Sequence, residues 1–248
     1  NEKNLNIKNV YGITLISSDK KIPYWNQQIL NQKMNIICSG EDKTGDIYNY
    51  KNVNDFINTI NLNYCHLVTA DGGFDYSENY NLQELSSYKL IYSEIYISLN
   101  IQKLKGNFII KIFDLFTYKT IQLIYLLYNC YSIIEFYKPL TSRLSNSEKY
   151  IICSGFQGCP NNVKTKLKEY FNKSEELHID VPQSFIDDIN KYNESFVKSQ
   201  ISSIEGILDL IKKEDTIKKG PTPNQIESAV RWCELYELPI NEKCTYLK

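Results

Sequence analysis

The sequence predicts an α/β protein with a Rossmann-like sheet, an antiparallel final hairpin and a helical C-terminal extension. Short apolar segments alternate with helical patterns as far as about residue 156. The last two apolar segments are joined by a loop that is too short for a helical crossover. Beyond residue 160 only helical patterns follow. Alternation of strands and helices is typical of a mostly parallel sheet with helices on both faces, and a short connection between strands favours an antiparallel pair.

The individual elements are predicted from the period of their apolar residues. The helical pattern in 81–104 places Leu85, Tyr88, Ile95 and Leu99 on one face, and 118–131 is apolar almost all round, which predicts a buried helix. The predicted strands are 10–16, 34–40, 66–71, 108–113, 133–138 and 149–156, and a short helix is predicted over 52–60.

The C-terminal part of the chain has a different composition. A helical apolar stripe runs through 183–213, and Thr222-Pro223-Asn224-Gln225 reads as a capping box that begins another helix. We therefore predict two domains: residues 1–160, which form the sheet domain, and residues 161–248, which form the helical extension.

Composition excludes several classes of protein. The hydrophobic content of 42% is enough for a sizeable core, and no apolar run approaches the roughly 20 residues of a membrane span. No signal peptide is visible at the N-terminus, and the odd number of irregularly spaced cysteines, 7, indicates reduced thiols in an intracellular protein. With only 2 histidines and no metal-knuckle spacing, we expect no metal site. A net charge of −1 argues against a generally basic surface but allows a local nucleic-acid groove.

One charged residue interrupts an otherwise apolar strand. In GNFIIKIFDLF (106–116), Lys111 lies within a segment that reads as a strand buried on both faces. A buried ammonium is costly without a partner, so Lys111 is expected near the strand end, beside an acid, or in a site that does chemistry. Asp71 follows the strand before it and precedes two glycines, and Glu148 begins the last strand. Ligands of α/β sheets bind beyond the carboxyl ends of strands, where these residues would converge.

Such a cluster has a chemical and a structural interpretation. A lysine between carboxylates can orient and deprotonate a hydroxyl or stabilise the developing oxyanion. The same residues could also form a satisfied buried ion pair, and Asp71 could be a simple turn residue before Gly72 and Gly73.

Longer motifs carry a resemblance to a known family. HLVTADGGFD, GNFIIKIFDLFT, LIYLLYNCY and FYKPLTSRLSNSEKYIICSGF, in this order between about Val10 and Phe156, resemble the eukaryotic cap-specific mRNA ribose 2′-O-methyltransferases of the FtsJ/RrmJ family. The likeness is greatest to those members that methylate the first transcribed nucleotide (cap 1). The C-terminal PNQIESAVRWCELYELP also resembles the end of their methyltransferase region.

The resemblance implies a fold, a cofactor and roles for particular residues. It implies a Rossmann-like fold that uses S-adenosylmethionine and a Lys-Asp-Lys-Glu tetrad, whose last three members match Asp71, Lys111 and Glu148. In that reading Lys111 activates the ribose 2′-hydroxyl. Cofactor contacts are expected from Asp46, in GDIYNY, from Thr14 and Leu15 at the end of the first predicted strand, and from Asp71.

The loop KPLTSRLSNSE is the expected RNA side. Its side chains suit phosphate and ribose, and a planar Arg fork suits phosphate in particular, although a solvated hairpin would read the same way. Phe74 and Tyr76 could stack on a base or simply pack. The RNA-binding candidates are Lys138, Ser142, Arg143, Ser145 and Asn146.

Two features of the family pattern are missing. The Gly-rich cofactor turn after the first strand and the first lysine of the tetrad are absent, so the chain is expected to lack that part of the domain and not to bind the cofactor fully by itself. The predicted function is cap 1 2′-O-methylation of capped mRNA in the nucleus, or in a cytoplasmic factory if the protein is viral, with the transcription or capping machinery as possible partners. Methylation of another RNA (cap 2 or ribosomal RNA) and an inactive RNA-binding scaffold remain alternatives. The sequence predicts no oligomeric state.

Overall fold

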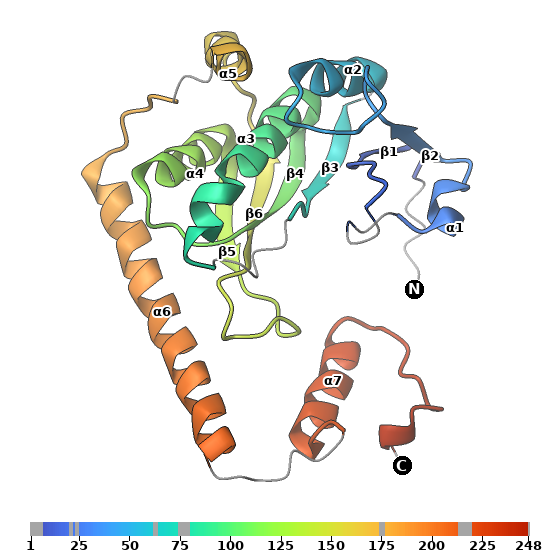
Figure 1. Ribbon diagram of the computed structural model, residues 1–248, viewed down its shortest axis with the longest axis vertical. Helices are drawn as coiled ribbons and strands as arrows, with labels where there is room; N and C mark the ends of the chain where they lie inside the picture. Colours follow the sequence, from blue (N-terminus) through green and yellow to red (C-terminus); the bar gives the residue numbers. More distant parts are fainter. Residues whose placement is uncertain are drawn as a thin grey trace. The chain divides into compact units, whose positions relative to one another are not determined.

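The computed structural model describes residues 7–19, 22, 25–61, 64–73, 80–173, 177–212 and 220–247 (Figure 1). These residues divide into two compact units, one of 1–138 with 147–194 and the other of 139–146 with 195–248. The predicted domain boundary at residue 160 stays a prediction. The two units are described separately.

The first unit is built on a four-stranded sheet. Its strands are β3 (Cys65–Ala70), β4 (Gln102–Ile112), β5 (Tyr131–Tyr137) and β6 (Lys149–Phe156), in the spatial order β3-β4-β6-β5. β3 and β4 are parallel, whereas β6 is antiparallel to both β4 and β5. The antiparallel final hairpin is therefore confirmed. The prediction of a mostly parallel sheet was wrong for the described four-stranded sheet, because β6 inserts between β4 and β5 and is antiparallel to both.

Two further strands form a small parallel sheet. β1 (Val10–Ile13) pairs with β2 (Asn35–Cys38), and the short helix α1 (Gln27–Leu30) lies between them in sequence. α2 (Tyr50–Ile60) follows β2, and the side chain of its N-cap residue, Asn49, accepts a hydrogen bond from the backbone of Lys51. In the described part of the chain no ladder of backbone hydrogen bonds joins this sheet to the four-stranded one.

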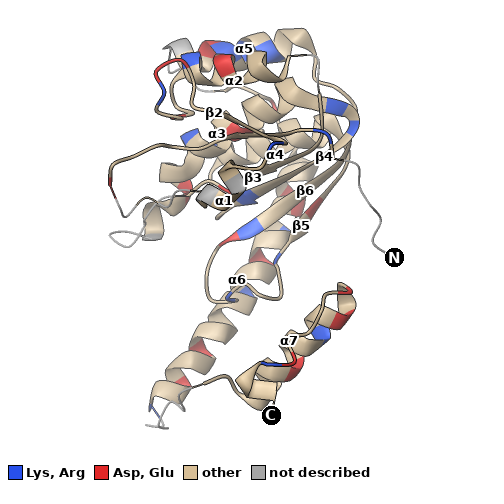
Figure 2. Ribbon diagram, turned by 90° about the vertical axis from the view of Figure 1, so that its right-hand side faces the viewer, with Lys and Arg blue, Asp and Glu red and all other residues tan. Residues whose placement is uncertain are grey.

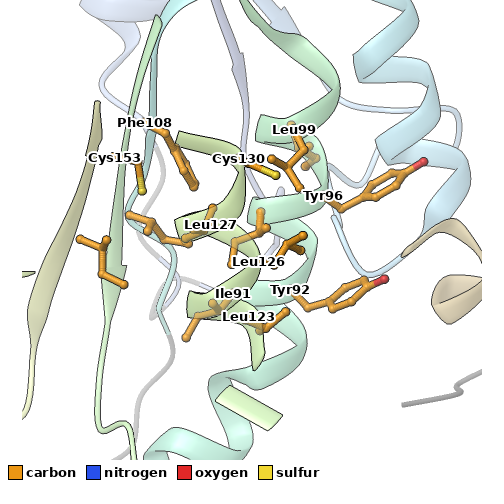
Figure 3. Close-up of a cluster of buried hydrophobic side chains, with 14 of the residues drawn as sticks. Ile91, Tyr92, Tyr96, Leu99, Phe108, Leu123, Leu126, Leu127, Cys130 and Cys153 are labelled. Atoms are coloured by element: carbon orange, nitrogen blue, oxygen red, sulfur yellow. The ribbon is translucent and has the colours of Figure 1, made fainter. Parts of the chain in front are cut away.

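One face of the four-stranded sheet is covered by two helices. α3 (Gln83–Ile101), which a 3-10 turn at Tyr80–Leu82 precedes, packs on β3 and β4, and α4 (Tyr118–Cys130) packs on β5 and β6. Figure 3 shows side chains of α3 and α4, among them Ile91, Leu99 and Leu127, turned towards Phe108 and Cys153 of the strands. This layer is the hydrophobic core, and most of α4 is buried in it, although Tyr118 and Tyr128 of that helix are exposed.

The other face of the same sheet is less covered. Side chains alternate along a strand, so Ile110 and Ile112 enter the core while Ile109 and Lys111 face the opposite way. On that opposite face Leu67 and Ile133 remain exposed. The prediction that β4 is buried on both faces was therefore wrong for the described residues, because the helices that pack on β4 lie on one side only.

Three helices follow the sheet. α5 (Asn161–Lys173) packs against α3, and the first part of α6 (Gln183–Lys212) places Tyr192 in a stacked contact with Phe136, with ring centroids 4.3 Å apart. The second unit contains the rest of α6, then α7 (Pro223–Leu235) and a final 3-10 turn, Thr245–Leu247. The predicted capping box at Thr222 is present. Lys and Arg are interspersed with Asp and Glu along these helices (Figure 2).

Every predicted strand and helix is present, with shifts at the ends. The predicted helix 81–104 ends earlier, at Ile101, and β4 begins at once with Gln102. The short helix α1 was not predicted. Among the described residues no helix is long and apolar enough to cross a membrane.

Candidate active site

Lys111 and Asp71 form an ion pair at the carboxyl ends of the parallel strands β3 and β4. Lys111 is the penultimate residue of β4, and Asp71 follows directly after β3. The Lys111 Nζ lies 2.8 Å from the Asp71 Oδ1, and it also donates a hydrogen bond of 3.3 Å to the Asp71 backbone carbonyl. The side chain of Lys111 is 14% exposed and that of Asp71 67% exposed. The lysine is thus tolerated in its apolar strand because it sits at the strand end, on the open face, beside an acid.

Tyr150 joins this pair from the neighbouring strand. It is the register partner of Lys111, and its hydroxyl donates to the Asp71 Oδ1 over 3.4 Å. Burial raises the pKa of Tyr150 to about 12, and the nearby carboxylates of Asp71 and Glu148 act in the same direction. The phenol therefore remains a hydrogen-bond donor at neutral pH.

Glu148 lies at the same edge of the sheet as Lys111 and Tyr150. It precedes β6 directly, and its backbone carbonyl accepts a hydrogen bond from the Lys138 ammonium. Of the ion pairs between described residues, none joins Glu148 to Lys111. Its catalytic role stays a prediction, supported by its position beside Tyr150.

A buried glutamate of α3 reaches the same turn. Glu94 is only 9% exposed, and its Oε1 accepts a 3.0 Å hydrogen bond from the backbone N–H of Gly72. Burial raises the pKa of Glu94 to about 7. The Gly72 hydrogen bond and Lys111 oppose that rise, and Asp71 adds to it. Two acids and one lysine are therefore electrostatically linked at the end of β3.

Three of the predicted cofactor residues come together at the ends of the small sheet, whereas Asp71 lies at the end of β3. The Ile16 N–H donates to the Thr44 carbonyl over 2.7 Å, and a Cβ added to Gly45 would lie 1.8 Å from the Thr14 carbonyl oxygen. Gly45 also has a φ of +66°, which favours glycine. Thr14, Leu15 and Asp46 therefore lie at one place, where the segment after β1 meets the loop after β2.

Asn52 holds this loop in shape. It is fully buried in α2, and its side-chain amide donates to Asp42, Thr44 and the Asp46 carbonyl, while its own oxygen accepts from the Asp42 N–H. The carboxylate of Asp46 accepts from the Tyr48 N–H over 2.8 Å. A carboxylate has further acceptor sites, so Asp46 can still bind the hydroxyls of a nucleoside.

The predicted RNA loop divides between the two units. Lys138 belongs to the first unit, and Ser142, Arg143, Ser145 and Asn146 belong to the second. Within the second unit, Leu144 of this loop and four residues of α6 line an open groove of about 500 Å³; the α6 residues are Lys198, Ser199, Ser202 and Ser203. A lysine and several hydroxyls suit phosphate contacts. Phe74 and Tyr76, the stacking candidates, lie outside the described residues.

A second charged cluster lies on the core face of the sheet. Lys149 is 1% exposed, and its Nζ donates to the Phe113 carbonyl over 2.6 Å. Burial lowers the pKa of Lys149 to about 8, although Asp114 partly offsets this effect. Glu84 of α3 accepts from the backbone N–H groups of Phe116 and Thr117 at the start of α4. No group of three or more metal-ligating side chains occurs in the part of the chain that the structure describes.

Sequence reasoning missed Glu94, Tyr150 and the core-facing Lys149. A signal for Glu94 was present, because it is the one acidic residue in the run LIYSEIYISL. Like Lys111, Glu94 is a charged residue within an otherwise apolar run. Tyr150 gave no signal in a chain with 20 tyrosines, since its role depends on the register between β4 and β6.

The fold and this site define a class of protein. A sheet that begins parallel and ends in an antiparallel hairpin carries a lysine–aspartate pair at its carboxyl edge. The family model for FtsJ-like methyltransferases matches residues 2–156. The chain therefore belongs to the FtsJ-like methyltransferase family.

Particular relatives refine this membership. The chain is 32% identical over 214 residues to cap-specific mRNA (nucleoside-2′-O-)-methyltransferase 1 of Mus musculus, covering 81% of this chain and 26% of that protein. It is 35% identical over 176 residues to inactive cap-specific mRNA (nucleoside-2′-O-)-methyltransferase 1B of Caenorhabditis briggsae, covering 67% and 21%. The chain thus spans about a quarter of the length of the curated relatives it matches.

A solved structure was also matched. It is titled as a ribosomal RNA methyltransferase from Plasmodium falciparum and is 17% identical, with a TM-score of 0.39, covering 52% of this chain and 67% of that one. A likeness of this size supports no further conclusion.

Proposed function

We propose that this chain carries the acceptor half of an mRNA cap 1 2′-O-methyltransferase, which methylates the ribose of the first transcribed nucleotide. The observation that carries the proposal is the Lys111–Asp71 pair, whose Nζ–Oδ1 distance is 2.8 Å. It lies beyond the carboxyl ends of parallel strands, where α/β sheets bind ligands. The names of the relatives add the substrate class, capped mRNA, to this proposal.

The mechanism follows from what the residues at this edge can do. Bound S-adenosylmethionine supplies an electrophilic methyl group on a sulfonium sulfur. Lys111 would hold the ribose 2′-hydroxyl and stabilise the negative charge that develops on the hydroxyl oxygen as its proton passes to water. Asp71 would keep the Lys111 ammonium in place, and Tyr150 would fix the Asp71 carboxylate by donating a hydrogen bond from its hydroxyl. Holding the hydroxyl in line with the methyl group accounts for much of the rate.

The cofactor would lie between the loops that follow β1 and β2 and the turn that follows β3. Asp46, Thr14 and Leu15 would hold its nucleoside, and Asp71 would lie nearer the reacting centre. The loop after β2 fits this role because Asn52 orders its backbone and leaves carboxylate acceptors for hydroxyl groups.

The RNA would enter from the β5–β6 loop. Lys138, Ser142, Arg143, Ser145 and Asn146 would contact phosphates and riboses, which positions an RNA without reading its sequence. Glu148 follows this loop directly and would complete the catalytic set. Capped mRNA also implies action in the nucleus, or in a viral cytoplasmic factory, beside the capping machinery.

The test is methyl transfer by the protein in its natural length, with radiolabelled S-adenosylmethionine and short capped RNA. Label at the 2′-oxygen of the first nucleotide, lost in Lys111→Ala, is expected. Label at the second nucleotide, or on uncapped ribosomal RNA, would assign the protein to another 2′-O-methylation. The exposed Lys191, which pairs with Asp188 over 3.2 Å, supplies the control Lys191→Ala.

An inactive RNA-binding protein is the second candidate. One relative that is 35% identical carries the word inactive in its name. The two candidates differ in one result. Capped RNA bound by a folded wild-type protein that transfers no methyl group would favour the scaffold.

A further inference from the structure

The turn after β3 is held on both sides. A Cβ added to Gly72 would lie 2.6 Å from the Glu94 Oε1 and 2.9 Å from the Leu90 Cδ2, so α3 touches the backbone there. A Cβ added to Gly73 would lie 3.3 Å from the Lys111 Nζ. The two glycines therefore let the turn fit between α3 and the Lys111 side chain.

Glu94 is the one polar group of α3 that reaches this turn through a described hydrogen bond. It accepts from the Gly72 N–H, and Gly72 directly follows Asp71. A neutral side chain could accept the same hydrogen bond without the cost of burying an anion. A carboxylate at this place is explained better if its charge acts on neighbouring charges.

The neighbouring groups are two charged side chains and one neutral phenol. Asp71 follows β3, Lys111 lies on β4, and Tyr150 of β6 contacts Asp71. Asp71 and Lys111 act on Glu94 with opposite signs. A change in the charge of Glu94 therefore changes the field at the Lys111–Asp71 pair.

We infer that Glu94 is a positioning residue of the transfer site: its buried carboxylate holds the Asp71–Gly73 turn and thereby sets how the Asp71 carboxylate meets the Lys111 ammonium. The inference deepens the proposed function and rests on it. Glu94 acts through the turn and through its charge.

The first test needs no activity. The amide resonances of Gly72 in the purified chain should shift with pH, with a midpoint near the Glu94 pKa of about 7. Glu94→Gln should abolish this titration. Lys111→Met should move the midpoint up, and Asp71→Asn should move it down, because Lys111 lowers and Asp71 raises the pKa of Glu94.

Glu84 supplies a matched control. It is a second buried glutamate of α3 that accepts backbone N–H groups, but those belong to Phe116 and Thr117. Glu84→Gln should leave the Gly72 titration unchanged. A Gly72 amide that does not titrate, or whose midpoint ignores both Lys111→Met and Asp71→Asn, would overturn the inference even if Glu94→Gln failed to fold.

The second test uses methyl transfer by the protein in its natural length. Glu94→Gln should lower kcat roughly tenfold and alter its pH profile near neutrality, with little change in KM for RNA, as expected for a misplaced catalytic pair. Glu94→Asp should restore part of the pH profile, and Glu84→Gln should keep its shape. A Glu94→Gln variant with wild-type kcat and pH profile would refute the inference. An inactive wild type beside a titrating Gly72 would instead refute the proposed function.

Discussion

Two lysine clusters lie on opposite faces of the same pair of strands. Lys111 of β4 combines with Asp71 and Glu94, and Lys149 of β6 lies among Asp114 and Glu84. Each set therefore contains one lysine, one aspartate and one glutamate from α3. The Lys111 cluster opens to solvent through an aspartate that is 67% exposed, whereas Lys149 is 1% exposed and donates to a backbone carbonyl. We expect the same residue types to serve the proposed chemistry where a substrate can reach them and to serve the architecture of the core where it cannot.

Replacing the open lysine should have the largest effect. Lys111→Met should lower methyl transfer by roughly 10³-fold, because it removes the cation that stabilises the developing oxyanion of the ribose hydroxyl. The melting temperature should change little, since an ion pair with one exposed partner contributes at most about 1 kcal/mol. Transfer rates from radiolabelled S-adenosylmethionine and thermal melts check both halves. If Lys111→Met retained methyl transfer, the Lys111 cluster would have no catalytic role and would not differ in function from the Lys149 cluster.

Replacing the closed lysine should reverse this pattern. Lys149→Ala should lower the free energy of unfolding by about 4 kcal/mol, because it leaves a cavity, unpairs the Phe113 carbonyl and isolates the Asp114 carboxylate. Urea unfolding followed by circular dichroism measures the loss. If the variant proved as stable as Lys191→Ala, the core cluster would have no architectural role.

The open cluster should make stability depend on pH. The pKa of Glu94 rises on folding from an ordinary 4.5 to about 7, so the unfolded chain loses this proton first as pH rises. The free energy of unfolding should therefore fall by roughly 3 kcal/mol between about pH 4.5 and 7 and stay lower above pH 7, because a pKa shift of one unit corresponds to about 1.4 kcal/mol. Glu94→Gln should flatten this part of the profile in urea unfolding series. A profile identical to wild type would show that burial of Glu94 carries no such cost.

The smallest effect is expected at the edge of the closed cluster. Thr117 is the N-cap of α4 and also donates to Glu84 over 2.7 Å, so Thr117→Ala should cost about 1 kcal/mol. Thermal melts at fixed pH measure the change. Thr222→Ala removes the cap of α7 and serves as a comparison in the second unit, where the Glu84 contact has no counterpart. Equal losses would indicate that the Glu84 contact adds nothing.

The open cluster could be predicted in part from the sequence, and the closed one could not. Lys111 and Asp71 were predictable because a charge in an apolar strand and a strand-ending acid before two glycines are local patterns. Tyr150 and Lys149 depend on the register between β4 and β6, which sets the face of every side chain and has no local signal. The open face was also not predictable from β4 alone, whose apolar run is typical of a strand covered on both sides.

The open edge of β3 has a practical consequence for purification. β3 is an edge strand in the described sheet, and its Leu67 is 57% exposed. Unpaired strand edges are templates for the addition of another chain. A preparation of residues 1–248 is therefore expected to self-associate as its concentration rises, and charged substitutions at Leu67 offer a way to keep it monodisperse without touching the Lys111 pair.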